Sequence, residues 1–391
     1  MPAEIATLPS DRPRRILSLD GGGIRGVFTL QILARIEELL RKHRGKSHLV
    51  LADEFDLIAG TSTGAIIATM LSWGMSVEQI ESNYTDQSAE MFKKAGWRAR
   101  WKAKYSARAI TDYLRKTFSE DGAGKVPAQL GTRRLRTLLL LVMRNATTGS
   151  AWPVSNNRKA KYNDEAMSDC NLKIELWQLV RASTAAPTYF PPEQIRLGAK
   201  EFIFIDGGIT PYNNPALIAF LMATLPSFNL NWGGGVDRLR VVSVGTGDAR
   251  AKLNKDQAVH VNWLDSAKYV IPALMHSVNL EQDLLCRVLG SWVGPDVDSD
   301  SALPADREMF SPIDDEIGGL TRGMDGLLPP SEKKFGYIRY NRPIRVPALD
   351  GEKAAAGDSL ALDDLRLMPM LKDQGRAYAT RAVQLAHLGV T

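Results

Sequence analysis

The chain has 391 residues, of which 44% are hydrophobic, and a formal net charge of +5. This composition is typical of a globular protein with a sizeable core, so it excludes a mainly disordered chain. Two cysteines are too few for a disulfide framework, no apolar signal segment precedes Arg15, and the longest apolar run (138–143) is too short to span a bilayer, so we expect a soluble cytoplasmic protein of one large or two smaller domains.

The first 75 residues predict an alternation of strands and helices. An apolar strand over 14–19 runs into a glycine turn, and leucines and isoleucines at helical spacing predict a helix over about 26–43. A second strand at 56–59 and a second helix at 65–73 repeat this unit. The alternation favours a mainly parallel central sheet with helices on its two faces, which is a three-layer α/β/α fold.

Later elements are spaced more widely along the chain. Strands are expected at 137–143, 202–205 and 239–244, and helices at 107–118, 172–182, 216–223 and 264–289. After about residue 295 the strand signal fades, apart from 335–340 and a few residues near Val346. A last helical stretch over 362–388 contains Pro369, which we expect to break or kink it.

A serine framed by glycines lies between the second strand and the second helix, in Gly60-Thr61-Ser62-Thr63-Gly64. A nucleophile in such a turn occupies a strained backbone position, and the chain passes so close to it that only small flanking residues fit. The helix N-terminus behind the serine favours developing negative charge. The same pattern arises by chance in loops that only cap a helix. The flanking strand and helix favour a catalytic role for Ser62.

A second glycine turn, Asp20-Gly21-Gly22-Gly23-Ile24-Arg25-Gly26, follows the first strand. Its spacing fits the fingerprint of a dinucleotide site, but that site needs an acid at the end of the second strand. Glu37 and Glu38 have about the right separation, yet they fall inside the predicted first helix. We therefore favour an oxyanion hole formed by the N–H groups of the three consecutive glycines. Arg25 would support this turn or add positive potential for a phosphate-bearing substrate. Alternatively, it forms an ordinary ion pair, for instance with Asp20.

A third turn, Asp206-Gly207-Gly208, ends a strand that we expect to be buried. A carboxylate there can accept the proton of Ser62 directly if the two side chains come within hydrogen-bond reach. Asp-Gly is also a common loop signal, so the pattern alone does not decide. A catalytic triad would require His260, His276 or His387, none of which lies in a turn of comparable chemistry. We predict a Ser62–Asp206 dyad.

A basic aromatic segment over 93–108 contains no acid. Trp97, Trp101 and Tyr105 are spaced four apart, so on a helix they form one stripe. In one interpretation this stripe packs on the core and the cations are its solvated edge. In the other, the segment is a rim that faces a membrane or binds a phosphate-bearing ligand. That rim would consist of Trp97, Arg98, Arg100, Trp101, Lys102, Lys104 and Tyr105.

The three turns, in this order, resemble those of the patatin-like phospholipase family, and so does the segment 181–192, which reads RASTAAPTYFPP. The resemblance covers about residues 14–250. It implies a patatin-like fold and a metal-free release of fatty acids from membrane phospholipids. The implied roles are nucleophile for Ser62, proton acceptor for Asp206 and oxyanion hole for Gly21, Gly22 and Gly23. Supporting roles fall to Arg25, Gly60, Gly64, Gly207 and Gly208.

Regulation enters only through this resemblance. Similar bacterial proteins include phospholipase effectors of antiphage defence that cyclic dinucleotides switch on, so the resemblance implies such an activator. We expect peripheral contact with the inner face of the membrane, no cofactor and no nucleic acid polymer as partner; an oligomer is compatible with the sequence. The expected division is a catalytic domain over 14–295 and a mostly helical extension over 296–391 packed on it. A nucleotide-dependent oxidoreductase and a non-catalytic membrane-binding module remain the alternatives.

Overall fold

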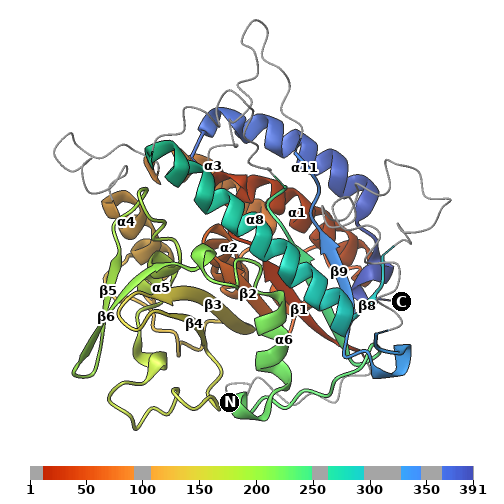
Figure 1. Cartoon of the computed structure of the whole chain (residues 1–391), viewed down its shortest axis with the longest axis horizontal. Coiled ribbons are helices and arrows are strands. Elements are labelled where there is room, and N and C mark those ends of the chain that lie inside the picture. Colours follow the sequence, from red (N-terminus) through yellow and green to blue (C-terminus); the bar gives the residue numbers. More distant parts are fainter. Residues whose placement is uncertain (1–11, 92–106, 249–262, 295–326, 345–362, 391) are drawn as a thin grey trace, which may run out of the picture.

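The computed structural model describes residues 12–91, 107–248, 263–294, 327–344 and 363–390. Within these residues one nine-stranded sheet runs in the order β5-β6-β3-β2-β1-β7-β9-β8, with β4 paired to β3 (Figure 1). The strands are β1 (Arg14–Leu19), β2 (Leu57–Thr61), β3 (Leu138–Asn145), β4 (Ser150–Ser155), β5 (Glu193–Leu197), β6 (Lys200–Asp206), β7 (Leu239–Val244), β8 (Ser291–Trp292) and β9 (Gly336–Tyr340). The helices are α1 (Gly26–Arg44), α2 (Thr63–Ser72), α3 (Val77–Met91), α4 (Ala107–Thr117), α5 (Leu176–Ser183), α6 (Ala216–Thr224), α8 (Trp263–Leu289) and α11 (Met368–Ala382).

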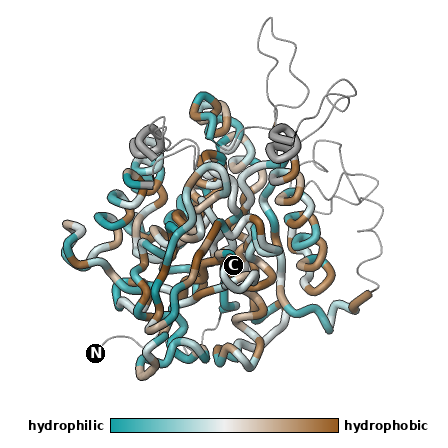
Figure 2. The backbone as a smooth tube through the Cα atoms, turned by 60° about the vertical axis from the view of Figure 1, so that its left-hand side comes forward, coloured by the Kyte–Doolittle hydropathy of each residue, from teal (hydrophilic) through white to brown (hydrophobic). Residues whose placement is uncertain are grey.

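The sheet separates two apolar cores, because successive side chains of a strand point to opposite faces. Leu17 and Leu19 of β1 pack in a cluster with α1, α2, α5 and α11, whereas Ile16 packs in a second cluster with α6 and α8. The central strands are accordingly hydrophobic on both faces and lie inside the molecule (Figure 2). The pairings among β1, β2, β3, β7, β8 and β9 are parallel, so the predicted three-layer α/β/α fold with a mainly parallel sheet is confirmed.

Several elements differ from the sequence expectation. The structure adds α3, β4, β5 and β8, none of which was predicted. The helix expected over 172–182 is a 3-10 turn at Asn171–Lys173 followed by α5. Pro369 stands in the first turn of α11, where its missing N–H is tolerated, so it marks the start of a helix and does not kink one. The strand expected near Val346 lies outside the described residues.

The part of the chain after residue 326 contributes to the same sheet. β9 lies between β7 and β8, and α11 packs on α1 with the rings of Phe28 and Tyr378 stacked 5.8 Å apart. Among the described residues, no helix is long and apolar enough to cross a bilayer. The predicted division at residue 295 stays a prediction.

Candidate active site

Strand register brings the three glycine turns to one edge of the sheet. Leu19, the last residue of β1, is level with Gly60 of β2 and Val244 of β7, so the chain leaves these parallel strands side by side. β6 runs antiparallel to β3 and places Asp206 opposite Met143, one residue beyond the level of Thr61. The strand that ends at the base, β6, therefore runs toward this edge in the opposite direction to β2, which leads to the nucleophile. The expectation of a buried strand at 202–205 is right only on one face, because Phe204 is buried whereas Ile203 is 40% exposed.

Ser62 occupies the strained position expected of a nucleophile. Its backbone has φ 53° and ψ −123°, outside the conformations that a residue with a side chain prefers. The neighbours hold it there: the N–H of Ser62 donates to Ser183 Oγ at 2.9 Å, and α2 begins at the next residue. Ser183 in turn donates to the Val142 carbonyl of β3 at 2.6 Å. The segment 181–192 thus fixes the serine turn from the side.

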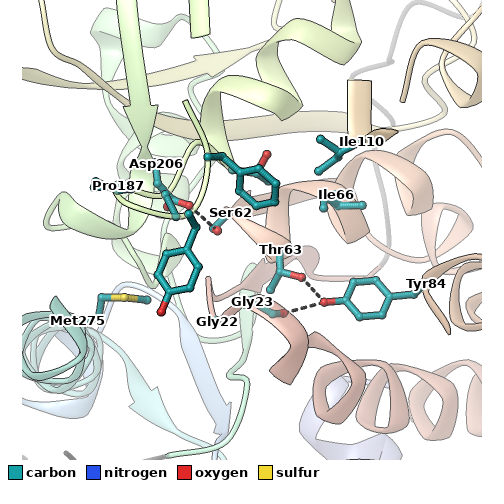
Figure 3. Close-up of a pocket in the computed structure, with 14 residues that line it drawn as sticks. Gly22, Gly23, Ser62, Thr63, Ile66, Tyr84, Ile110, Pro187, Asp206 and Met275 are labelled. Atoms are coloured by element: carbon teal, nitrogen blue, oxygen red, sulfur yellow. Dashed lines mark hydrogen bonds between the residues drawn. The ribbon is translucent and has the colours of Figure 1, made fainter. Parts of the chain in front are cut away.

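The Ser62 hydroxyl donates a hydrogen bond of 2.7 Å to Asp206 Oδ2 (Figure 3). The second carboxylate oxygen, Oδ1, accepts the N–H of Gly208 at 2.6 Å, which fixes the orientation of the carboxylate. Asp206 is 5% exposed. Burial raises the pKa of Asp206 to about 6, although the hydrogen bonds from Ser62 and Gly208 and the positive charge of Arg181 oppose the shift. A carboxylate with this pKa is ionised at neutral pH and can accept a proton.

The backbone segments at this edge pack so closely that the supporting positions require glycine. A Cβ on Gly60 would overlap the Gly64 carbonyl oxygen, and one on Gly64 would overlap the carbonyl oxygens of Leu19 and Asp20. A Cβ on Gly207 would likewise overlap the Val142 carbonyl. Strand β2, the serine turn and β1 could not approach each other with larger residues at these positions.

The first glycine turn borders Ser62, but its three glycines differ. Gly22 and Gly23 line the same pocket as Ser62 and Asp206. The N–H of Gly21 instead donates to the Asn213 carbonyl at 3.2 Å. The prediction that Gly21 contributes to an oxyanion hole is therefore wrong, since its amide already has an acceptor in the protein. Gly21 serves close packing, because a Cβ there would overlap Asn213 Oδ1.

Tyr84 of α3 holds the glycine turn, and sequence reasoning missed it. Its hydroxyl donates to the Gly23 carbonyl at 2.6 Å and lies 2.9 Å from Thr63 Oγ1 at the start of α2 (Figure 3). Burial raises the pKa of Tyr84 to about 12, so the phenol keeps its proton at neutral pH. One side chain thereby links the turn at Gly23 to the helix that follows Ser62. The apolar residues Val77, Ile80 and Tyr84, three to four apart, were the available signal for α3.

Arg25 supports the glycine turn through backbone contacts. Its side chain donates to the Gly22 carbonyl at 3.3 Å and to the Gly247 carbonyl, beyond the end of β7, at 3.2 Å. Asp20 pairs with Arg339 of β9 and not with Arg25. The alternative that Arg25 and Asp20 form the ion pair is therefore wrong.

The dyad opens into a mostly apolar pocket of about 770 Å³, its open mouth included. Ile66, Ile110 and Met275 lie around Ser62 and Asp206 in Figure 3, from α2, α4 and α8. The remaining lining residues include Ala186, Pro187, Tyr189 and Phe190 of the segment that follows α5. An apolar pocket beside a hydroxyl nucleophile suits an ester with an alkyl chain.

Two of the three histidines considered for a triad have other partners. His276 Nδ1 lies 2.8 Å from Asp248 Oδ1, and His387 Nδ1 lies 2.8 Å from the Tyr340 hydroxyl. His260 and the basic aromatic residues Trp97, Arg98, Arg100, Trp101, Lys102, Lys104 and Tyr105 lie outside the described residues. The two acids that a dinucleotide site would use lie on α1, where Glu37 pairs with Arg41 and Glu38 with Arg35. Neither acid lies at the end of β2.

Comparison with known proteins agrees with this geometry. The family model described as patatin-like phospholipase matches residues 17–220, just over half of the chain. The cGAMP-activated phospholipases of Escherichia coli (strain TW11681) and Vibrio cholerae serotype O1 are 34% and 33% identical over 54% and 52% of this chain and 56% of each relative. The chain thus spans little more than half the length of these curated relatives. The match to the structure of human GIVD cytosolic phospholipase A2 covers 96% of this chain and 60% of that chain, with 11% sequence identity and a TM-score of 0.44. The chain belongs to the patatin-like phospholipase family.

Proposed function

We propose that the protein is a serine lipid acyl hydrolase that releases fatty acids from membrane phospholipids. The observation that carries this proposal is the 2.7 Å hydrogen bond from the strained Ser62 to the buried Asp206, at an apolar pocket. Membership of the family and the likeness to proteins named phospholipases support the same reaction. An oxidoreductase site at the first glycine turn and a non-catalytic module have no comparable support.

The proposed reaction has two steps. Ser62 Oγ attacks the ester carbonyl while its proton passes to Asp206 Oδ2, and the proton then goes to the departing alcohol. The N–H groups of Gly22 and Gly23 stabilise the oxyanion, with Tyr84 and Arg25 holding the turn that carries them. Water next attacks the acyl-enzyme with Asp206 as base, and the fatty acid is released.

Ser62→Ala tests the nucleophile. We expect it to abolish fatty acid release from phospholipid vesicles and labelling by a fluorophosphonate probe, while the far-UV circular dichroism stays that of the wild type. Ser72→Ala is a matched control, since Ser72 is a buried serine at the other end of the same helix, and it should retain both activities. Full activity in Ser62→Ala would overturn the assignment.

We further propose that a cyclic dinucleotide activates the protein. The support is the likeness to two relatives named cGAMP-activated phospholipases, over about half of the chain. Fatty acid release measured with and without 3′,3′-cGAMP and 2′,3′-cGAMP tests this proposal. Equal rates in every sample would contradict it, and the Ser62→Ala protein controls for contaminating lipases.

We also propose that the protein works in the cytoplasm at the inner face of the membrane, with α8 beside its point of contact. Val270 and Leu274 are one helical turn apart on α8 and are 54% and 47% exposed. Met275, the next residue, lines the pocket. An exposed apolar face next to the pocket would let the lipid enter without crossing water. The basic aromatic segment remains a second prediction for this contact.

A further inference from the structure

Arg181 is a buried cation whose hydrogen bonds are incomplete. It belongs to α5, has no exposed surface, and donates through Nη2 to the Pro191 carbonyl at 2.9 Å. Its guanidinium carbon lies 5.2 Å from the ring centroid of Phe190, which lines the pocket. Nε and Nη1 of Arg181 have no hydrogen-bond partner in the part of the chain that the structure describes. A desolvated charge in this state is costly unless it interacts favourably with another charge.

Two arginines of the described chain that are as deeply buried as Arg181 have a carboxylate in direct contact. Arg15 lies 2.6 Å from Glu54, and Arg339 lies 2.6 Å from Asp20. No carboxylate of the described residues lies within 4 Å of the Arg181 guanidinium. The carboxylates that act on its charge, Glu193 and Asp206, do so from a greater distance. Arg181 therefore lacks the neighbouring carboxylate that stabilises the buried charges of Arg15 and Arg339.

The positive charge of Arg181 acts on Asp206. The N–H of Asp206 donates to the carbonyl of Ala185, four residues after Arg181, at 3.0 Å, so the end of α5 lies against the base. Among the described groups that shift the pKa of Asp206, only Arg181 is charged. Glu193 on β5 acts on Arg181 but not directly on the base. Because Asp206 must be ionised to take the Ser62 proton, a cation buried nearby favours the reactive form, and the low-dielectric surroundings strengthen that effect.

We propose that Arg181 is a positioning residue that keeps Asp206 in its carboxylate form for proton transfer from Ser62. This inference rests on the proposed hydrolase function. Arg181 itself makes no contact with the substrate, since its side chain has no exposed surface. It acts on the reaction through the charge of the base.

The test is the pH dependence of kcat/KM on a soluble ester. Release of p-nitrophenol from p-nitrophenyl butyrate is read after quenching every sample at one alkaline pH, and active enzyme is counted with a fluorophosphonate. Arg181→Met should move the acid limb of the profile up by about 1 pH unit or more, because the base then protonates more readily. At the alkaline plateau the rate should return to within a few-fold of the wild type. Arg181→Lys, which keeps the charge, should restore the limb to near its wild-type position.

Arg240→Met is the matched control. Arg240 is also buried and also has Nε and Nη1 without partners, but the charges that act on it are those of Asp237 and Tyr340. The acid limb of the Arg240→Met pH profile should coincide with that of the wild type. An unmoved limb in Arg181→Met, or an equal loss at all pH values, would overturn the proposal. Failure of the proposed function would look different, because the wild type itself would then neither hydrolyse the ester nor react with the fluorophosphonate.

Discussion

At the scale of single residues, Asp206 is buried, yet its carboxyl group must be ionised to accept the Ser62 proton. Burial raises its pKa from 3.8 to about 6, so the folded protein holds this proton more tightly than the unfolded chain does. The folding stability contributed by this group is fully present below about pH 4, is lost as the pH rises through 6, and stays lost above that. About two pKa units correspond to roughly 3 kcal/mol, which is the cost of an ionised base in the site.

Asp206→Asn should remove this cost, since the amide keeps the shape of the side chain without its charge. We expect the variant to be inactive but more stable than the wild type at pH 8, by up to roughly 3 kcal/mol, with the difference vanishing toward pH 4. Urea unfolding at pH 4.5, 6 and 8 measures it. Asp373→Asn, at an exposed position on α11, should show no such trend. A destabilised Asp206→Asn protein at pH 8 would contradict the prediction.

The sequence predicts some residues of this site better than others. Ser62 and Asp206 stand out because each lies in a glycine turn after a strand, which is a local pattern. The separate role of Gly21 depends on Asn213, and those of Tyr84, Ser183 and Arg181 depend on which side chains face the turns after folding. The hydrogen bonds of Gly21, Tyr84 and Ser183 join residues 61 to 192 positions apart, so no local sequence pattern predicts them.

At the scale of elements, prediction succeeded where the hydrophobic pattern is strong. β1 and β7 have their predicted bounds, and α1, α2 and α6 differ by one or two residues. The apolar residues of α1 follow the helical period, whereas α2 and α6 are nearly continuous apolar runs. β8 has two residues, and β5 is a short edge strand with alternating exposure, so neither carries enough signal. α3 is polar except on its inner face.

Helix α8 carries the element-scale prediction. Replacing both Val270 and Leu274 with Gln should weaken binding to phosphatidylglycerol-containing vesicles by roughly 10- to 30-fold, because two half-exposed aliphatic side chains lose about 1 kcal/mol each of apolar burial. Sedimentation with vesicles measures the binding. Hydrolysis of a soluble butyrate ester should stay at the wild-type rate, since neither residue lines the pocket.

Leu225→Gln is the control for this substitution. Leu225 is 42% exposed and follows the last residue of α6, so it offers a comparable apolar surface elsewhere on the molecule. Vesicle binding by this variant should match the wild type. Equal binding by the α8 double variant would remove α8 from the proposed membrane contact.

At the scale of the whole molecule, residues far apart in the chain meet at the start of the first glycine turn. Arg339 of β9 binds Asp20 through both guanidinium Nη atoms, at 2.6 and 3.2 Å, and also donates to Ser243 at 2.6 Å. Both charged side chains are 1% exposed. Asp20 is the first residue of the glycine turn that contains Gly22 and Gly23. We therefore propose that β9 and α11 belong to the catalytic domain and do not form a separable extension. The sequence predicts the strand over 335–340, but it does not show that this strand pairs with β7.

This pairing gives a prediction about the assembled fold. Arg339→Met leaves the Asp20 carboxylate buried without its partner, so we expect a loss of about 3 to 5 kcal/mol in the free energy of unfolding. Asp20→Asn combined with Arg339→Met leaves no buried charge at this position, and it should recover much of that loss. Although desolvation opposes it, the Asp20 carboxylate raises the pKa of Arg339, so the guanidinium keeps its charge. Burial raises the pKa of Asp20, so the unfolding is measured at pH 8, where the carboxylate is ionised.

Urea unfolding of the wild type, both single variants and the double variant measures the coupling between the two residues. If the losses in the single variants simply add in the double variant, the ion pair does not join β9 to the glycine turn energetically. If the double variant is as stable as the wild type but hydrolyses a soluble ester more slowly, the pair holds the turn in its working geometry at no net gain in stability. That result would match the behaviour of buried ion pairs that neutral side chains can replace without loss of stability.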